Sequence, residues 1–248
     1  MNESDSSHLL VALRERFRKC NSDSKICQDD LNRLLTEDWW PLSFLYAYHK
    51  DVDVTYAVIL ECLKWRRSFS VCNISLLELK PLLDRKLAYL HGKDCNGYSI
   101  LWINMRQHVI GLANTDRLII YWLERHTMEL QAAPITLLFD MSSCSLQNML
   151  NNFSMDLGLI KFIIRSCKYY YPNSLKSVLI FENPTLLKAS WLLIRTWMSP
   201  EMQPLLQHVK RLSLPSYLPI SVIPKRYGGQ VRICLFHIQI LSTIISFI

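Results

Sequence analysis

The side chain best placed for chemistry is Asp140, which lies near the end of a near-continuous apolar run at residues 134–141. Such a run predicts a strand buried on both faces, and the carboxyl ends of parallel strands form the usual ligand edge of a sheet. A carboxylate there could serve as a general acid or base. It could equally cap the loop after the strand, and we favour this structural role. His91 and Glu124 are weaker candidates, because each stands alone.

The sequence lacks the motifs of the common enzyme classes. Its seven histidines form no H-E-x-x-H motif and no cluster with cysteines at zinc-binding spacing, and no G-x-S-x-G elbow occurs. Its six glycines spell neither of the glycine-rich motifs that let backbone N–H groups approach a phosphate. We therefore predict a protein that is not an enzyme, with no catalytic residue, no metal site and no cofactor.

The cysteines and the N-terminal residues indicate the compartment. Eight cysteines are scattered along the chain without a C-x-x-C pair, and the first seven residues are polar and acidic, unlike a secretory signal. These features predict reduced thiols on the cytosolic side of membranes. The net charge of +7 suits an anionic partner, such as a membrane surface or a nucleic acid, or only aids solubility.

The pattern of apolar residues changes along the chain. Up to about residue 70 it has helical periodicity, with one helix expected to begin near Asp53. Beyond that, short apolar runs around Asp94–Gly97 predict a hairpin, and helices expected at 114–129, 155–171 and 185–197 alternate with buried strands at 134–141 and 175–181. The prediction is an α/β fold: a helical lobe at 1–75, a mixed and mostly parallel sheet with flanking helices at 76–230, and a hydrophobic tail at 231–248.

Several local signatures in this order resemble the CRAL-TRIO family of lipid-carrying proteins. They are Trp65-Arg66, Tyr89 to Gly97, Phe139-Asp140-Met141-Ser142, Tyr170-Tyr171-Pro172, Asn183-Pro184, Trp197 to Pro200, Leu218-Pro219 and Pro224 to Gly229. Tyr121 to Arg125 and Trp197 to Glu201 are most similar to members that carry a motile sperm domain after the CRAL-TRIO domain. The resemblance covers about residues 30–229 and implies a sheet that floors an apolar cavity, with a movable helix as its lid.

The resemblance also implies which residues form the cavity and what it holds. The lipid-binding cavity would be lined by Leu90, Leu101, Ile103, Ile135 and Leu137, although aliphatic side chains of this kind could also simply fill a core. Phospholipid-binding members place tyrosines and hydroxyl residues at four of these positions. They also have an inositol-binding glutamate where this chain has Asn173, and its lysine partner where it has Leu205. We therefore predict a hydrophobic ligand without a buried phospholipid headgroup.

A helix at residues 199–208 is the predicted lid. Ser199 as N-cap, Pro200 at the first helical position and Glu201 in the first turn favour a helix start, while Pro204 interrupts the helix that should follow. The lid residues would be Pro200, Leu205 and Leu206.

Two groups of basic residues could contact an anionic membrane. Lys210, Arg211, Lys225 and Arg226 form the predicted membrane-surface group, and Lys161, Arg165 and Lys168 form a stripe that is more often an ordinary solvated helix face. Nucleic acid is not expected as a partner, because no recognised module is present. The tail contains sixteen residues, 233–248, without Lys, Arg, Asp or Glu, which suits a short membrane anchor or an end without function.

The sequence thus predicts that a cytoplasmic protein associated with endomembranes binds a lipid, and that intermembrane transfer of this lipid could follow. We expect these endomembranes to include the endoplasmic reticulum membrane, which the hydrophobic tail would bind. The alternative is an endomembrane adaptor that uses the α/β lobe as a docking surface for proteins. The oligomeric state stays open.

Overall fold

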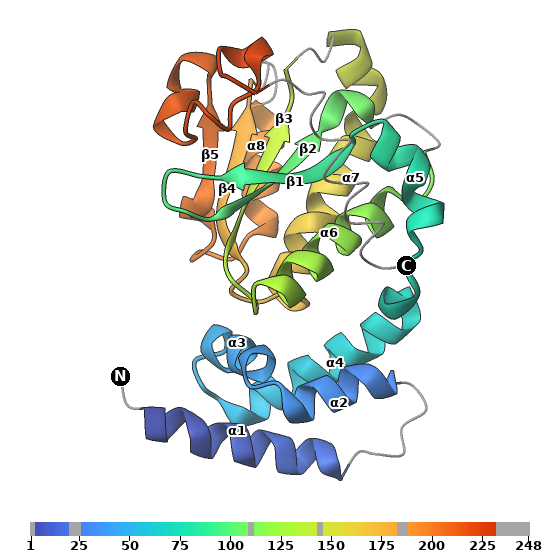
Figure 1. Cartoon of the computed structure of the whole chain (residues 1–248), viewed down its shortest axis with the longest axis vertical. Helices are drawn as coiled ribbons and strands as arrows, with labels where there is room; N and C mark the ends of the chain where they lie inside the picture. The colour runs from blue at the N-terminus through green and yellow to red at the C-terminus, as the bar shows by residue number, and fades with distance from the viewer. Residues whose placement is uncertain (1–2, 20–25, 109–111, 143–145, 183–187, 232–248) are drawn as a thin grey trace.

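The computed structural model describes residues 3–19, 26–108, 112–142, 146–182 and 188–231. Figure 1 shows a group of helices below a larger lobe that contains a sheet. The described residues form two hydrophobic clusters, one built from buried residues between Leu13 and Leu63 and the other from buried residues between Val71 and Tyr227.

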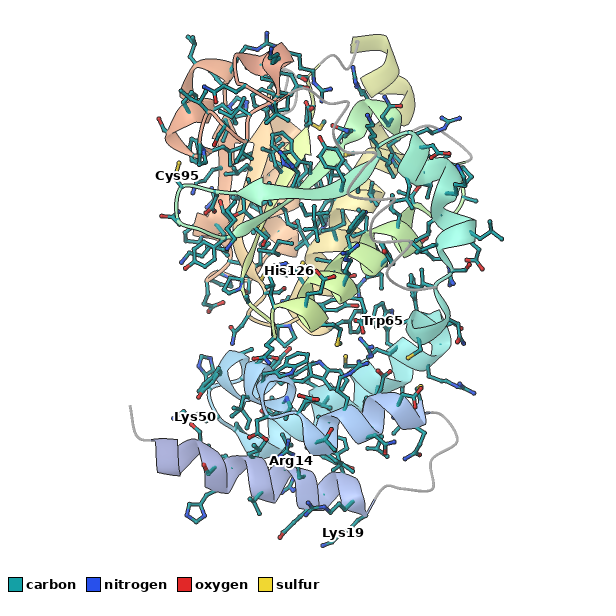
Figure 2. All side chains as sticks on the ribbon, in the orientation of Figure 1. Arg14, Lys19, Lys50, Trp65, Cys95 and His126 are labelled. Carbon is teal, nitrogen blue, oxygen red and sulfur yellow. The ribbon has the colours of Figure 1, made fainter. Side chains whose placement is uncertain are left out.

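Four helices form the smaller lobe: α1 (Glu3–Arg18), α2 (Gln28–Thr36), α3 (Trp39–Ala47) and α4 (Val52–Phe69). Helix α4 begins earlier than the sequence suggested, because the Asp51 carboxylate accepts a hydrogen bond from the Val54 backbone N–H at 3.0 Å and caps the first turn. It ends at Ser70, which adopts a left-handed conformation. Figure 2 shows Trp65 near this end of α4, close to the larger lobe.

The larger lobe begins with the short 3-10 helix η1 (Val71–Asn73) and with α5 (Leu76–Asp84), followed by strands β1 (Ala88–Lys93) and β2 (Ser99–Asn104). The hairpin predicted at Asp94–Gly97 joins these two antiparallel strands, and Gly97 has the positive φ of +86° that such a turn favours. A 3-10 turn, η2 (Met105–Gln107), follows β2.

Helices and strands then alternate, as predicted for residues 114–197, and a further strand follows that was not predicted. Helix α6 (Thr115–Glu129) leads to β3 (Ile135–Asp140), α7 (Leu146–Tyr169) to β4 (Leu175–Phe181), and α8 (Lys188–Trp197) to β5 (Leu206–Val209). The five-stranded sheet has the order β1-β2-β3-β4-β5, and all pairs from β2 onward are parallel. Right-handed crossovers in this sequential order place α6, α7 and α8 on the same face, which we call the helix side.

The opposite face of the sheet is covered by the last described segment, residues 210–231, which contains the 3-10 helices η5 (Arg211–Ser216) and η6 (Lys225–Tyr227). The ring of Tyr227 packs against that of Phe181 in β4, with centroids 4.8 Å apart. The Cys95 backbone N–H in the hairpin donates to the Tyr217 carbonyl at 2.9 Å. We call this face the C-terminal side.

The predicted lid helix at residues 199–208 is wrong. After a turn at Ser199, the chain forms the 3-10 helix η4 (Gln203–Leu205) and then strand β5. Pro204 has no N–H to continue a helix, and Leu206 to Val209 instead pair with β4 at the sheet edge. Pro200 is exposed and Leu206 is a buried strand residue, so neither of them lies on a lid helix.

Candidate functional site

The five residues predicted to line a cavity lie together on the helix side of the sheet. Leu90, Leu101 and Leu137 are register partners on β1, β2 and β3, and the same row continues through Val178 on β4 to Leu206 on β5. Ile103 and Ile135 lie two residues from Leu101 and Leu137 along their strands, and therefore on the same face. The fold thus collects these aliphatic side chains into one apolar surface that crosses all five strands.

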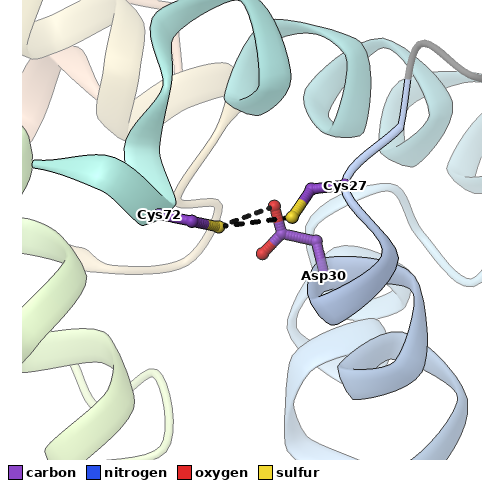
Figure 3. A group of neighbouring side chains, drawn as sticks. All are labelled: Cys27, Asp30 and Cys72. Carbon is purple, nitrogen blue, oxygen red and sulfur yellow. Dashed lines mark hydrogen bonds between the residues drawn. The ribbon is translucent and has the colours of Figure 1, made fainter.

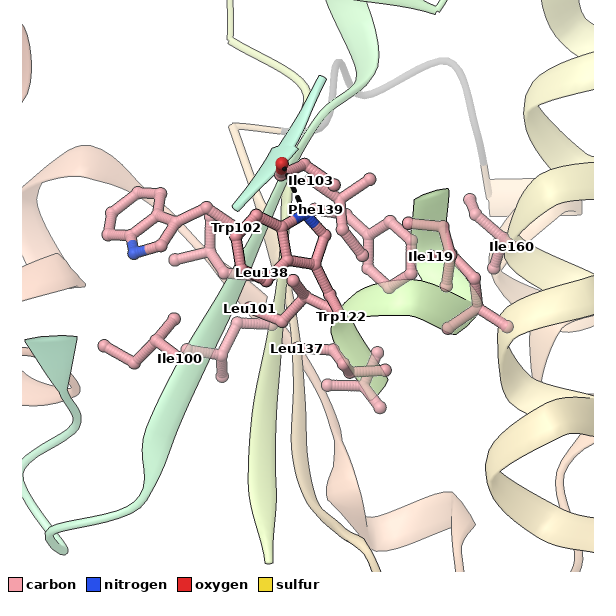
Figure 4. Packing of buried hydrophobic residues seen from close by; sticks show 14 of the residues in the cluster. Ile100, Leu101, Trp102, Ile103, Ile119, Trp122, Leu137, Leu138, Phe139 and Ile160 are labelled. Atoms are coloured by element: carbon pink, nitrogen blue, oxygen red, sulfur yellow. Dashed lines mark hydrogen bonds between the residues drawn. The ribbon is translucent and has the colours of Figure 1, made fainter. Parts of the chain in front are cut away.

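Helices α6 and α7 cover this surface. Figure 4 shows Trp122 and Ile119 of α6 and Ile160 of α7 on the same side of the strands as Leu101 and Leu137, while Trp102 points to the other side. The Trp122 indole N–H donates to the Ala88 carbonyl of β1 at 2.9 Å, which fixes α6 over the sheet edge.

Burial of the row limits how a ligand could reach it. Leu101, Ile103, Ile135 and Leu137 have 0% exposed surface, and Leu90 is half-buried at the sheet edge. A ligand could contact the four buried side chains only after the covering elements move apart. Their role as cavity lining stays a prediction.

Helix α8 carries large apolar side chains on its outer surface. Ile194 of α8 and Met198, the residue directly after this helix, are buried in the core, whereas Leu192 and Leu193 are 64% and 44% exposed. Leu205, the remaining residue of the predicted lid, is half-buried in η4 after this helix. Helix α8 therefore has apolar residues both facing the core and facing solvent, as a lid would need. It precedes residues 199–208, where the sequence predicted the lid.

The positions aligned with a headgroup site carry no pair of charges. Asn173 lies in the turn before β4, where its side-chain N–H₂ donates to the Ser43 carbonyl of α3 at 3.0 Å. Its amide therefore connects the two lobes, and Leu205 offers no charge.

Both oxygens of the Asp140 carboxylate accept hydrogen bonds from other residues of the fold. Its Oδ1 accepts from the Ser142 backbone N–H at 3.0 Å and from the Ser142 hydroxyl at 2.6 Å. Its Oδ2 accepts from the Tyr227 hydroxyl, and from Arg226 Nη2 at 3.2 Å. The carboxylate is buried, and it joins the end of β3 to the segment that covers the C-terminal side. These bonds favour the structural role for Asp140 over a catalytic one.

The predicted membrane-surface residues divide into two kinds. Lys210, Arg211 and Lys225 are exposed, whereas the Arg226 guanidinium faces Asp140 and is only partly exposed. We therefore exclude Arg226 from the membrane-facing group. Directly after Arg211 lies Leu212, whose surface is 96% exposed.

A small hollow of about 290 Å³ lies on the C-terminal side of the sheet. Asp94, Thr136, Lys176 and Gln207 are among its lining residues, and Asp94 Oδ2 accepts from the Thr136 hydroxyl at 2.7 Å. Because this lining is mostly polar, the hollow does not suit a hydrocarbon chain.

Sequence reasoning missed a buried charge network between the two lobes. Arg66 of α4, which is 2% exposed, donates to both carboxylate oxygens of Glu124 on α6, at 2.8 and 2.6 Å. Its Nη2 also donates to Asp30 Oδ1 on α2 at 2.8 Å, and the Tyr171 hydroxyl donates to Glu124 at 3.0 Å. Beside this network Trp65 stacks on Tyr170, with ring centroids 3.7 Å apart. The only signal in the sequence was the Trp-Arg pair itself, because its partners lie far away along the chain.

Acidification should weaken this network. Burial by itself would raise the pKa of Glu124, but the charge and hydrogen bonds of Arg66 outweigh it and hold that pKa below its ordinary value. A carboxyl group with a depressed pKa stabilises the fold above its unfolded-state pKa, about 4.3 for Glu, and loses this contribution as the pH falls through the folded-state value. Glu124→Gln should therefore be less stable than wild type near neutral pH and approach it at acidic pH.

Urea unfolding from about pH 7 to about pH 3 measures this difference. The control is Glu61→Gln, because Glu61 is an exposed carboxylate on α4 that pairs with Lys64. A difference between wild type and Glu124→Gln that stays constant with pH would contradict a stabilising role for the ionised carboxylate.

The order of elements, the one-sided helices and the apolar row define a single-sheet α/β module with an aliphatic helix-side face. The CRAL/TRIO domain model matches residues 83–229, which is more than half of the chain. The chain therefore belongs to the CRAL/TRIO family.

The proteins similar to this chain include two curated relatives and one solved structure. CRAL-TRIO domain-containing protein C3H8.02 of Schizosaccharomyces pombe is 27% identical over 231 residues, which are 87% of this chain and 49% of that protein. Phosphatidylinositol transfer protein CSR1 of Eremothecium gossypii is 27% identical over 154 residues, which are 60% of this chain and 34% of that protein. The crystal structure of Sfh5 superposes with a TM-score of 0.61 at 15% identity, covering 100% of this chain and 99% of that one, and supports the fold.

The chain spans about half or less of the length of these two curated relatives. Among the described residues, no helix has both the length and the apolar character needed to cross a bilayer. The hydrophobic tail predicted at 231–248 lies, apart from Val231, outside the described residues.

Proposed function

We propose that this chain binds a hydrophobic lipid on the helix side of its sheet and transfers it between membranes. The observation that carries the proposal is the aliphatic row from Leu90 to Leu206, which crosses the whole sheet beneath α6, α7 and α8. An acyl chain that leaves a bilayer gives up about 0.8 kcal/mol for each buried CH₂. A continuous apolar surface of this kind can replace those contacts.

The ligand is more apolar than a phospholipid, or keeps its headgroup at the mouth of the site. The helix-side row offers no hydroxyl group, and the positions of the expected glutamate and lysine hold Asn173 and Leu205. A phosphate buried among leucines would lose its hydrogen-bond partners at a cost of several kcal/mol. This ligand class differs from the one in the name of the Eremothecium gossypii relative.

Helix α8 is the element that moves to admit the ligand. Its inner residue Ile194 and the adjoining Met198 hold it closed against the core. Its outer residues Leu192 and Leu193 can contact lipid at a membrane surface. Contact with the membrane would replace the burial that is lost when the helix swings away from the sheet.

Mass spectrometry of the intact protein and of its organic extract tests the proposal. We expect one lipid per chain after purification from a eukaryotic host, without phosphatidylinositol at stoichiometric amounts. Stoichiometric phosphatidylinositol would contradict the ligand class but support the carrier function. Protein that is folded, empty and unable to take up lipid from vesicles would contradict the carrier function itself.

The complete burial of Leu101, Ile103, Ile135 and Leu137 favours a second candidate function. In that case the helix side is a permanently packed core, and the lobe is an adaptor that docks other proteins at an endomembrane. An adaptor is isolated without lipid and binds its protein partners equally well from detergent-washed and untreated preparations. The same mass spectrum therefore separates the two candidates.

The exposed segment around η5 is the proposed membrane-contact surface. Lys210, Arg211 and Lys225 supply the positive charge, and Leu212 supplies an apolar side chain that can enter the interface. Each basic residue near an anionic leaflet contributes about 1 kcal/mol, so replacing all three by glutamine should weaken binding on the order of 100-fold.

Flotation with phosphatidylserine-containing vesicles measures this loss. The control is Lys161→Gln with Arg165→Gln, which removes two exposed charges from α7 and should leave flotation nearly unchanged. Equal losses in both variants would indicate a general charge effect and contradict a defined surface at η5.

Cytoplasmic association with endomembranes, including the endoplasmic reticulum through residues 231–248, is part of the proposal. Within the family, we propose that the nearest kinship is with the CRAL-TRIO half of motile sperm domain-containing protein 2. The sequences Tyr121 to Arg125 and Trp197 to Glu201 support this kinship. Comparing the location of the full chain with that of a variant without residues 231–248 tests the role of the tail.

A further inference from the structure

Two cysteines that are 45 residues apart in the sequence meet where α2 of the smaller lobe faces the start of the larger lobe. Cys27 occupies the N-cap position of α2, and Cys72 lies in η1, with their Sγ atoms 3.6 Å apart. The carboxylate of Asp30, in the first turn of α2, lies beside them, with its Oδ2 3.7 Å from Cys72 Sγ. Figure 3 shows the two sulfurs and this carboxylate facing one another, and the three ligand atoms lie within 4.8 Å of each other.

We propose that Cys27, Asp30 and Cys72 bind a thiophilic divalent cation of the Zn²⁺ class. Zinc–thiolate bonds of about 2.3 Å at a tetrahedral angle separate two sulfurs by about 3.8 Å, and a thiolate and a carboxylate oxygen by about 3.5 Å. The observed separations of 3.6 and 3.7 Å are close to these values. By contrast, the sulfurs of a disulfide are only about 2.0 Å apart.

The surroundings of the cluster suit a cation held by three anionic ligands. Asp30 is 0% exposed, and Arg66 holds its Oδ1 at 2.8 Å, which leaves Oδ2 directed toward Cys72. Such outer hydrogen bonds orient the carboxylates that bind metals. With the two thiolates, the Asp30 and Glu124 carboxylates, one divalent cation and the guanidinium groups of Arg33 and Arg66, the total charge is zero.

The fourth coordination position would be open to water, because Cys72 is exposed and Cys27 is half-buried. Three protein ligands and one water make an exchangeable site, unlike the closed sites in which four protein ligands surround zinc. Bound metal would connect the start of α2 in the smaller lobe to η1, the first element of the larger lobe. The cation should therefore stabilise the folded chain in proportion to its occupancy.

Cobalt titration of the reduced, metal-depleted full chain tests the site. We expect one Co²⁺ per chain, with the near-ultraviolet charge-transfer absorption of cobalt–thiolate bonds, displaced by Zn²⁺. Cys27→Ser and Cys72→Ser should each weaken binding by roughly 100-fold or more, since loss of an outer partner alone costs up to about that much. The matched control is Cys95→Ser, because Cys95 is an exposed thiol on the distant β1–β2 hairpin (Figure 2).

A second measurement guards against variants that merely misfold. Zn²⁺ should raise the melting temperature of wild type and Cys95→Ser but not of Cys27→Ser or Cys72→Ser, each of which should melt cooperatively without metal. Cobalt–thiolate absorption that is unchanged in either ligand variant would overturn the proposal. So would an intact Cys27–Cys72 disulfide in protein whose free thiols were alkylated at cell lysis, since this would assign the pair a redox role.

Discussion

Replacing Arg66 with methionine will lower the free energy of unfolding by about 3–5 kcal/mol, the range expected when one partner is removed from a buried ion pair. Methionine fills much of the same volume but removes the main counter-charge of the fully buried Asp30 and the largely buried Glu124, which keep only the longer contacts to Arg33 Nη1 at 3.3 and 3.5 Å. The two carboxylates would then repel each other across the boundary between the lobes. Because Asp30 belongs to α2 and Glu124 to α6, the helical lobe would lose an attachment to the larger one.

The control for this prediction is the next residue of the same helix. Arg67 is exposed, so Arg67→Met should change stability by no more than about 0.5 kcal/mol. Urea unfolding of both variants at neutral pH gives the comparison. If both variants lose a similar, small amount of unfolding free energy, solvent or rearrangement must compensate the buried carboxylates. The network would then have little importance for stability.

Replacing Gly229 with alanine should cost about 3 kcal/mol, the upper end of the range for overpacking. A Cβ atom at this position would lie 2.0 Å from the carbonyl oxygen of Ile223 and 2.5 Å from its carbonyl carbon. These are backbone atoms, so they cannot rotate away as the end of a long side chain could. The added methyl group would separate the segments that meet at the Pro224–Val231 bridge and loosen the cover on the C-terminal side of the sheet.

A second glycine gives the opposite expectation. Gly158 lies within α7, and a methyl group added there would meet no atom of the described residues within 4 Å. Gly158→Ala should therefore stabilise the protein by about 0.5–1 kcal/mol. Thermal unfolding of the two variants side by side tests what decides whether a Gly→Ala change stabilises or destabilises the protein. We expect the distance of the added methyl group from neighbouring atoms to decide it, and not the loss of glycine as such. A Gly229→Ala variant as stable as wild type would show that the closing turn can shift without cost.

The central strands could be predicted because their physical signal is local. A parallel strand covered on both faces needs apolar residues at every position, and the runs at 134–141 and 175–181 correspond to β3 and β4. The helix predicted at 114–129 corresponds in the same way to α6. The family resemblance also implied that Leu90, Leu101 and Leu137 share one surface, but it could not show how tightly the helices close over them.

Strand β5 and the charge network could not be predicted, because both depend on contacts between distant residues. The favourable helix start at Ser199 and Pro200 masked a four-residue strand whose stability comes from pairing with β4. Arg66 and Glu124 are 58 residues apart, and Cys27 and Cys72 are 45 apart, so neither pair has a spacing that motif rules recognise. Local patterns identify elements, whereas these partnerships exist only once the elements are packed.

The sequential strand order has a consequence for how the protein is made. Each parallel strand pairs with the one synthesised just before it, so the sheet can be extended in the direction of translation, without waiting for distant segments. The crossover helices emerge between the strands and can cover their side of the sheet as it grows. The other side has no cover until residues 210–231 leave the ribosome, so the nascent chain exposes Trp102 and Phe181 until that segment has been made.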